Sequence, residues 1–155
     1  MAVSSHIFVY GLLTFPDVVT ALTGQQIEMK PAVLPGYRRF GLSKSPLQTA
    51  VPVLLPETGY RQLGQVLLDV DPAAIAILDY FEELDSGHYV KTAVRIEVEG
   101  QWLEAFCYSA GPALAPYVSG DWQPEQVSAA ARADLIAHLI PTMLAAMPAT
   151  SATES

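Results

Sequence analysis

Near its start the chain reads HIFVYGLLTFPDVV, an apolar run that a glycine interrupts. The stretch from Ile7 to Tyr10 predicts a short buried strand. Glycine adds a backbone entropy cost and contributes no packing, so a strand that only needs burial has no use for Gly11 at its end. Residues 14–17 (TFPD) resemble a capping box, and the helix that follows is predicted to end at Gly24. The loop after Tyr10 is therefore a candidate binding loop.

Between Ala32 and Val70, apolar stretches alternate with glycine and proline, a pattern typical of several short β-strands. The breaks fall at Pro35-Gly36, Ser45-Pro46, Pro52, Pro56 and Glu57-Thr58-Gly59. Asp71 and Pro72 then indicate the start of a second helix, with the aspartate as N-cap and the proline in the first turn. We predict that this helix runs to about Glu83.

Strict alternation marks the next strand, in which one face carries Val90, Thr92, Val94, Ile96 and Val98. Glu99-Gly100 predicts a tight turn, after which residues 102–108 return as the hairpin partner. An alanine-rich amphipathic helix is predicted over residues 124–147, bent near Pro141 because proline lacks the N–H that a helix interior requires. We expect one domain over residues 1–148 and a disordered tail over residues 149–155.

Composition narrows the class of protein. The 155 residues are 51% apolar and 15% charged, which suits one compact core. The formal net charge is −8, from 16 acidic and 8 basic residues, so the chain would repel a phosphate backbone and we expect no nucleic-acid partner. No stretch reaches the roughly 18 continuous apolar residues of a membrane span, and no basic leader precedes the first apolar run. We expect a cytoplasmic protein with no membrane partner.

The residues that usually carry metal or thiol chemistry are sparse. Cys107 is the only cysteine, so it cannot form an internal disulfide, and in the return strand we expect it to be buried filler rather than a nucleophile. The three histidines stand apart in the sequence, so no metal site is predicted. The chain has no Gly-x-Ser-x-Gly elbow and no phosphate-binding glycine loop, which leaves hydrolase and kinase chemistry without support.

The second predicted helix carries the most informative residue, Glu82. If Ile75 defines zero and each residue advances by about 100°, Glu82 falls at about −20° and Glu83 at about 80°. Glu82 therefore points with the apolar stripe, and Glu83 can reach water. Burial and the negative end of the helix dipole would both raise the pKa of the Glu82 carboxyl, an environment that suits a general base. Helix phase supports the general-base interpretation no more strongly than a purely structural one. In the structural interpretation, either the helix is already frayed at Glu82 or Glu82 forms an ion pair with a cation such as Lys91 or Arg95.

Several segments in a fixed order resemble the gamma-glutamylcyclotransferase-like family, in particular its plant avirulence-induced branch. The family typically shows a strand that ends in a Tyr-Gly-Ser/Thr-Leu loop, a proline-rich strand, and an Asp-x-x-Glu helix followed by tyrosine. The corresponding pieces are FVYGLL (8–13), LPGYRRF (34–40), VPVLLPETG (51–59), GQVLLDV (64–70), LDYFEELDSGHYVKTAVRIEV (78–98), AFCYSAG (105–111) and GDWQPEQ (120–126). They extend along nearly the whole chain.

The resemblance implies an α+β fold, a small mixed β-barrel flanked by helices, with no metal and no organic cofactor. The family's catalytic glutamate maps onto Glu82, and Tyr89 is expected to be a substrate-binding residue. The substrate-holding loop maps onto Val9, Tyr10, Gly11, Leu12, Leu13 and Thr14. Gly11 would let the backbone approach the substrate carboxylate, and the helix start after it would offer N–H donors.

The activity that the resemblance implies is a ring closure on a small-molecule partner, a gamma-glutamyl compound. Glu82 would take a proton from the substrate's α-ammonium group, and the freed amine would attack the gamma-carbonyl to give 5-oxoproline. Two positions depart from the family pattern: Leu12 replaces a serine or threonine, and Glu83 stands where many members have glycine. A second hypothesis, from a different class, is a non-catalytic module that binds a carboxylate metabolite in the same pocket.

Overall fold

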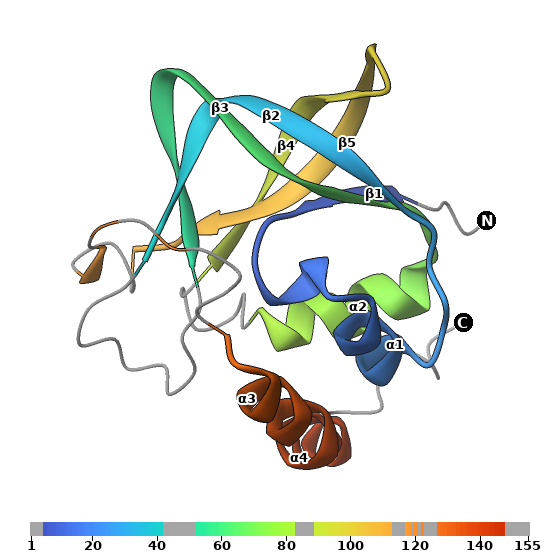
Figure 1. The fold of residues 1–155 in the computed structure, drawn as a ribbon. Helices are drawn as coiled ribbons and strands as arrows, with labels where there is room; N and C mark the ends of the chain where they lie inside the picture. The colour runs from blue at the N-terminus through green and yellow to red at the C-terminus, as the bar shows by residue number, and fades with distance from the viewer. Residues whose placement is uncertain are drawn as a thin grey trace.

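The computed structural model describes residues 5–41, 52–82, 89–112, 117, 118, 120, 122 and 127–147. Its strands are β1 (Ser5–Val9), β2 (Met29–Phe40), β3 (Val53–Val70), β4 (Tyr89–Val98) and β5 (Gln101–Ala110). They close into a barrel in the order β1-β3-β2-β4-β5, and the helices gather on one side of it (Figure 1). The expected α+β fold, a small barrel flanked by helices, is confirmed. The predicted tail, residues 149–155, lies outside the described residues.

Strand β1 closes the barrel because it pairs on both of its edges. It runs antiparallel to β3, where Phe8 lies opposite Val66, and parallel to β5, where Ile7 lies opposite Phe106. The other pairs, β2 with β3, β2 with β4, and β4 with β5, are antiparallel. The sheet is therefore mixed, and the end of β1 lies at the seam between the first and last strands of the chain.

The segment predicted as several short strands forms two long strands instead, so that prediction was wrong. β2 has 12 residues and β3 has 18, and both run through the glycines and prolines that were interpreted as breaks. Gly36 and Gly59 bend the strands with φ of 81° and 86°. The register shifts here, since Pro35 pairs with Arg61 but Tyr37 pairs with Pro56. A small barrel needs strongly bent strands, and such bulges bend a strand without ending it.

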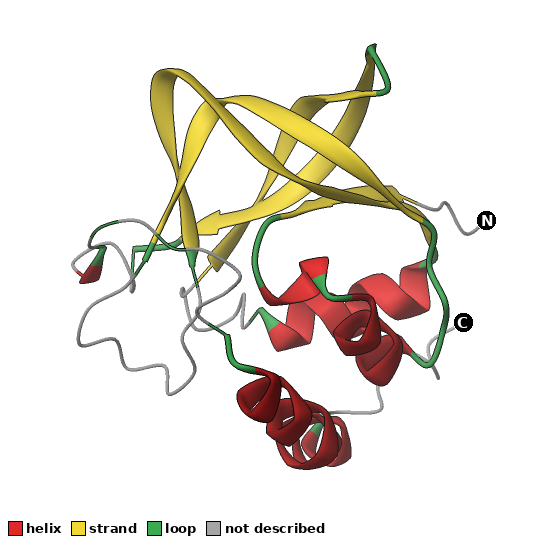
Figure 2. Ribbon diagram, viewed as in Figure 1, coloured by secondary structure: helices red, strands yellow, loops and turns green. Residues whose placement is uncertain are grey.

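Two helices follow strands as predicted. The N-cap of the first helix differs from the prediction, and the second helix ends at Phe81 rather than at about Glu83. α1 spans Pro16–Thr23, and α2 spans Pro72–Phe81. Gly24, with φ of 70°, ends α1, and the Asp71 side chain caps α2 by accepting a hydrogen bond from the Ala74 N–H at 2.8 Å. Figure 2 shows both helices beneath the barrel, between it and the C-terminal helices.

The C-terminal helix starts later than predicted and changes its geometry within its length. α3 (Ala129–Asp134) begins after Ser128, whose hydroxyl accepts from the Ala131 N–H at 3.0 Å, and residues 127 and 128 are not helical. A π-helical turn, Leu135–Leu139, leads into α4 (Ile140–Ala146). Pro141 cannot donate to a carbonyl one turn earlier, and the chain widens just before it. The predicted bend thus takes the form of a π-turn, and the predicted start at residue 124 was wrong.

Alternation along the strands separates two apolar cores. In β1, Ile7 and Val9 face the helices, whereas Phe8 and the following Tyr10 belong to the cluster inside the barrel. Gly64 of β3 crosses β1 closely, because a Cβ there would collide with the Val9 carbonyl oxygen and the Phe8 ring. The end of β1 is therefore fixed by packing on both of its faces.

The predicted hairpin of β4 and β5 is confirmed. Glu99 and Gly100, with φ of 52° and 79°, form the turn, and Val98 pairs with Gln101 beside it. Cys107 of β5 is fully buried inside the barrel, as expected, and burial raises the pKa of its thiol to about 12. Across the described ranges, no helix is long and apolar enough to span a membrane.

Candidate active site

The loop after β1 contains Gly11, and packing alone requires a glycine there. A Cβ on Gly11 would lie 2.7 Å from Cγ and 2.8 Å from Cδ of the Pro52 ring, closer than such atoms approach. The Tyr89 hydroxyl donates a hydrogen bond to the Pro52 carbonyl at 2.9 Å, which holds Pro52 in place. Tyr89 and Gly11, both predicted to bind substrate, are thus linked through Pro52.

The loop then forms one 3₁₀ turn, Leu12–Thr14, before α1 begins. Leu12 and Leu13 are only 6% and 3% exposed, and both side chains pack in the core beneath the barrel, as does Val9. These three side chains stabilise the loop. A ligand at this loop would therefore meet the backbone of residues 11–13 rather than their side chains.

Thr14 does not cap α1 as the sequence pattern suggested, and the capping-box prediction was wrong. Phe15 occupies the N-cap position, with no side-chain hydrogen bond there. The Thr14 hydroxyl instead donates to the Gly11 carbonyl oxygen at 2.6 Å, and the Thr14 N–H donates to the same oxygen at 3.0 Å. The short 3₁₀ turn puts the hydroxyl nearer to this carbonyl than to the first turn of the helix, so Thr14 holds the loop in its turned conformation.

Glu82 lies directly after α2, at its C-cap position. Its N–H donates to the Leu78 carbonyl oxygen at 2.9 Å, so the helical hydrogen bonding extends to this residue, and the residue is half-buried. The charge of Glu82 contributes to raising the pKa of the hydroxyls of Tyr10 and Tyr108. Glu82 thus interacts electrostatically with the hydroxyls of Tyr10, which follows β1, and of Tyr108, in β5. Glu83, the neighbour with which it was compared, lies outside the described residues.

Two buried tyrosines flank this position. Burial chiefly, then Tyr89 and Glu82, raise the pKa of Tyr10 well above its ordinary value. Burial also raises the pKa of Tyr108, followed by the Asp79 carboxylate and Glu82. Both phenols therefore stay protonated and act as hydrogen-bond donors. The Tyr10 hydroxyl donates to the Tyr108 carbonyl oxygen, across the seam between β1 and β5.

Asp79 is a residue of the site that the sequence analysis did not single out. It accepts a hydrogen bond from the Tyr108 hydroxyl at 2.7 Å and pairs with the Lys91 ammonium at 3.0 Å. It lies three residues before Glu82, and on a helix that spacing places two side chains on the same face. The Asp-x-x-Glu spacing was thus the available signal.

Arg39 is a second residue that was not predicted. Its guanidinium Nη1 donates to the Tyr10 carbonyl oxygen at 2.8 Å, next to Gly11. In the sequence it is one of two adjacent arginines on a strand, and no local pattern distinguishes it from Arg38. Only the fold brings it to the loop.

Comparison with solved structures shows the class of fold. A solution structure of an Arabidopsis thaliana protein aligns with a TM-score of 0.64 and 25% identity, over 91% of each chain. A structure titled gamma-glutamyl cyclotransferase aligns with a TM-score of 0.64 and 18% identity, over 76% of this chain and 69% of the other. The barrel and its helices are thus the gamma-glutamyl cyclotransferase-like fold.

Sequence comparison identifies the family. Residues 7–124 match the model of the family described as gamma-glutamyl cyclotransferase, AIG2-like. AIG2-like protein C of Arabidopsis thaliana is 28% identical over 122 residues, which cover 77% of this chain and 67% of the relative. The chain belongs to the gamma-glutamyl cyclotransferase, AIG2-like family, and the resemblance to its plant branch is confirmed.

Proposed function

We propose that this protein is a gamma-glutamyl cyclotransferase that converts a small gamma-glutamyl compound into 5-oxoproline and a free amine. The observation that carries the proposal is the position of Glu82. Glu82 lies directly after α2 and its charge acts on the buried Tyr10 hydroxyl, and Tyr10 begins the loop that also contains Gly11. This electrostatic link between Glu82 and the start of the loop supports the proposal that the two act on one substrate.

The loop would bind substrate oxygens through its amides. The carbonyl oxygens of Tyr10, Gly11 and Leu12 accept hydrogen bonds from Arg39, Thr14 and Phe15, respectively. In a trans peptide the N–H points away from the carbonyl of the same plane, so the amide of each of the next three residues points away from the carbonyl that is bonded in its own plane. These amides would hold the substrate α-carboxylate or the oxyanion of the ring-closing step. Leu12 removes a hydroxyl from the loop but leaves this backbone surface intact.

Glu82 would move one proton twice. It first takes a proton from the α-ammonium group, and the freed nitrogen then attacks the gamma-carbonyl carbon and forms the ring bond. The protonated Glu82 next gives that proton to the leaving nitrogen as the original amide bond breaks, and the ring nitrogen releases its remaining extra proton to solvent, which leaves the neutral lactam N–H of 5-oxoproline. Holding the substrate in a ring-closing pose supplies much of the rate, because a well-oriented intramolecular attack can lower the barrier by about 7–11 kcal/mol.

The test is to incubate the pure protein with a panel of gamma-glutamyl amines and gamma-glutamyl dipeptides and to detect 5-oxoproline by mass spectrometry. We expect product with the wild type and none with Glu82→Gln. Turnover that survives Glu82→Gln would remove the mechanism. Tight binding of a panel member without turnover would instead indicate the non-catalytic module for a carboxylate metabolite.

A further inference from the structure

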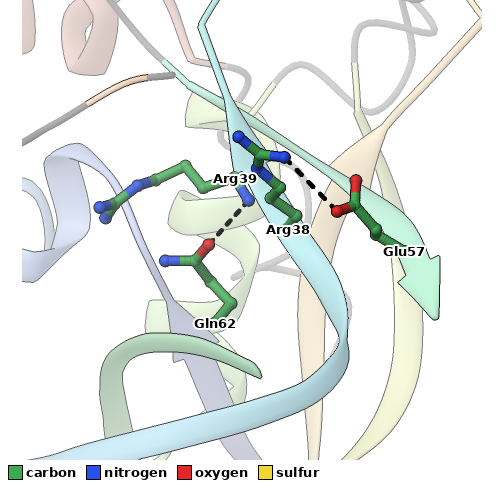
Figure 3. Close-up of polar contacts among 4 residues, drawn as sticks. All are labelled: Arg38, Arg39, Glu57 and Gln62. Carbon is green, nitrogen blue, oxygen red and sulfur yellow. Dashed lines mark hydrogen bonds and ion pairs between the residues drawn. The ribbon is translucent and has the colours of Figure 1, made fainter. Parts of the chain in front are cut away.

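Arg39 lies near the end of β2 and reaches back to the end of β1. Its backbone N–H donates to Gln62 Oε1 at 2.7 Å, and Gln62 is itself buried. Figure 3 shows this bond and the two arginines leaving β2 in different directions, Arg38 toward Glu57 and Arg39 toward the other side. The backbone of Arg39 is thus held in place independently of the contacts that its side chain makes.

Contacts with the loop and with an aromatic ring help to hold the guanidinium. Nη1 donates to the Tyr10 carbonyl oxygen at 2.8 Å, and the guanidinium carbon lies 5.2 Å from the centre of the Trp122 ring, a distance typical of a cation–π contact. Trp122 is 2% exposed, so the ring is a fixed surface. A planar cation between a ring face and a carbonyl has little freedom to move, which makes the direction of the hydrogen bond well defined.

The Tyr10 carbonyl belongs to the same peptide plane as the Gly11 N–H. The described residues contain no cis peptide bond, so these two groups point in opposite directions. Glycine can adopt many backbone angles because it has no side chain. The Tyr10–Gly11 peptide plane is therefore only weakly restrained by the sterics of Gly11 itself. A bond to the Tyr10 carbonyl therefore sets the direction of the first amide of the loop, as Thr14 does for the next plane through the Gly11 carbonyl.

We propose that Arg39 is a positioning residue, which fixes the Tyr10–Gly11 peptide plane so that the loop amides face the substrate. This inference rests on the proposed function of the loop. Arg39 acts through the backbone and also places a positive charge beside a loop that would bind an anion. Lysine would not replace it, because an ammonium on a flexible stem cannot both stack on Trp122 and donate in the fixed direction of the guanidinium.

The experiment compares Arg39→Lys with Arg38→Lys, the same change one position earlier on the strand, where the side chain pairs with Glu57 instead. The first readout needs no substrate: amide hydrogen exchange and chemical shifts of residues 11–13, measured by NMR. We expect Arg39→Lys to shift the Gly11 and Leu12 amide signals and to speed their exchange at least about tenfold, since the plane is freed. Arg38→Lys should leave both amides as in the wild type.

The second readout is kcat/KM for the gamma-glutamyl compound found by the panel. Arg39→Lys should lower it by about 10- to 100-fold, the effect of a small displacement of a positioned group, and Arg38→Lys should not. Unchanged loop amides in a folded Arg39→Lys protein would overturn the inference, and so would an unchanged kcat/KM. If the wild type turns over no panel member, the proposed function fails while the NMR comparison still decides whether Arg39 fixes the loop. Should Arg39→Lys not fold, Trp122→Phe, which keeps a smaller ring face, is expected to give the same amide changes to a lesser extent.

Discussion

The Tyr108 hydroxyl donates a 2.7 Å hydrogen bond to Asp79, which joins β5 to α2 one helical turn before Glu82. The Lys91 ammonium binds the second oxygen of the same carboxylate from β4. Both strands of the hairpin are therefore tied to the helix that carries the proposed acid/base group. The bond sets where the end of α2 lies against the barrel.

A double-mutant cycle measures this bond. Tyr108→Phe removes the donor, and Asp79→Leu replaces the acceptor with an apolar side chain of similar shape. Each single change should lower the free energy of unfolding by about 1–3 kcal/mol, because its partner loses a partly buried hydrogen bond to a charged group. The double variant should lose clearly less than the sum. Additivity within about 0.5 kcal/mol in urea titrations would show that the two groups do not interact.

The two adjacent glutamates should differ in activity. Glu82→Gln removes the proposed acid/base group and should lower kcat by about 10²- to 10⁴-fold. Glu83→Gln should stay near wild type, because the sequence pattern predicts that Glu83 points about 100° away from Glu82, toward water. The measurement is the steady-state rate of 5-oxoproline release with both variants at equal concentration. Equal losses would mean that the register of the catalytic glutamate is wrong.

A substitution of Pro52 should suppress part of the destabilisation that Gly11→Ala causes. Gly11→Ala places a methyl carbon 2.7 Å from the Pro52 ring and should lower the free energy of unfolding by about 1–3 kcal/mol through overpacking. Pro52→Ala in the same chain removes the ring atoms and should restore part of that loss. Pro52→Ala alone is the reference for the ring's own contribution. A double variant no more stable than Gly11→Ala in thermal melts would place the strain elsewhere.

Cys107 should make stability fall at alkaline pH. Burial raises the pKa of its thiol from 9.0 to about 12, so between these values the unfolded chain ionises while the folded chain stays neutral. Below pH 9 the thiol contributes no pH dependence to stability. Between pH 9 and about pH 12, this thiol should lower the free energy of unfolding by up to about 1.4 kcal/mol per pH unit. Urea titrations of the wild type and Cys107→Ala from pH 8 to 11 should diverge in slope above pH 9. Parallel curves would refute the assignment.

The sequence by itself determined the elements whose signals are local. Asp71-Pro72 begins α2 because the aspartate caps its own first turn, and Gly24 ends α1 because glycine adopts a left-handed conformation. The alternation of apolar and polar residues before Glu99-Gly100 was sufficient to predict the hairpin, because residues close together in the chain set both its turn and its register. The barrel was predicted from the ordered segments that resemble the family. Helix phase predicts that Glu82 points with the apolar stripe, and both this orientation and its catalytic role stay predictions.

Only the tertiary structure decided which distant groups meet. Glycine and proline between residues 32 and 70 looked like strand breaks because a local pattern cannot distinguish a break from a bend, and closing the barrel makes them bends. Arg39 and the Tyr10 carbonyl, or Asp79 and Tyr108, are joined by hydrogen bonds across strands and helices far apart in the chain. Such contacts depend on how the strands close and where α2 packs, and no window of sequence contains both partners. The sequence was thus sufficient to identify the loop. The contact of Arg39 with the loop backbone could be identified only from the closed barrel.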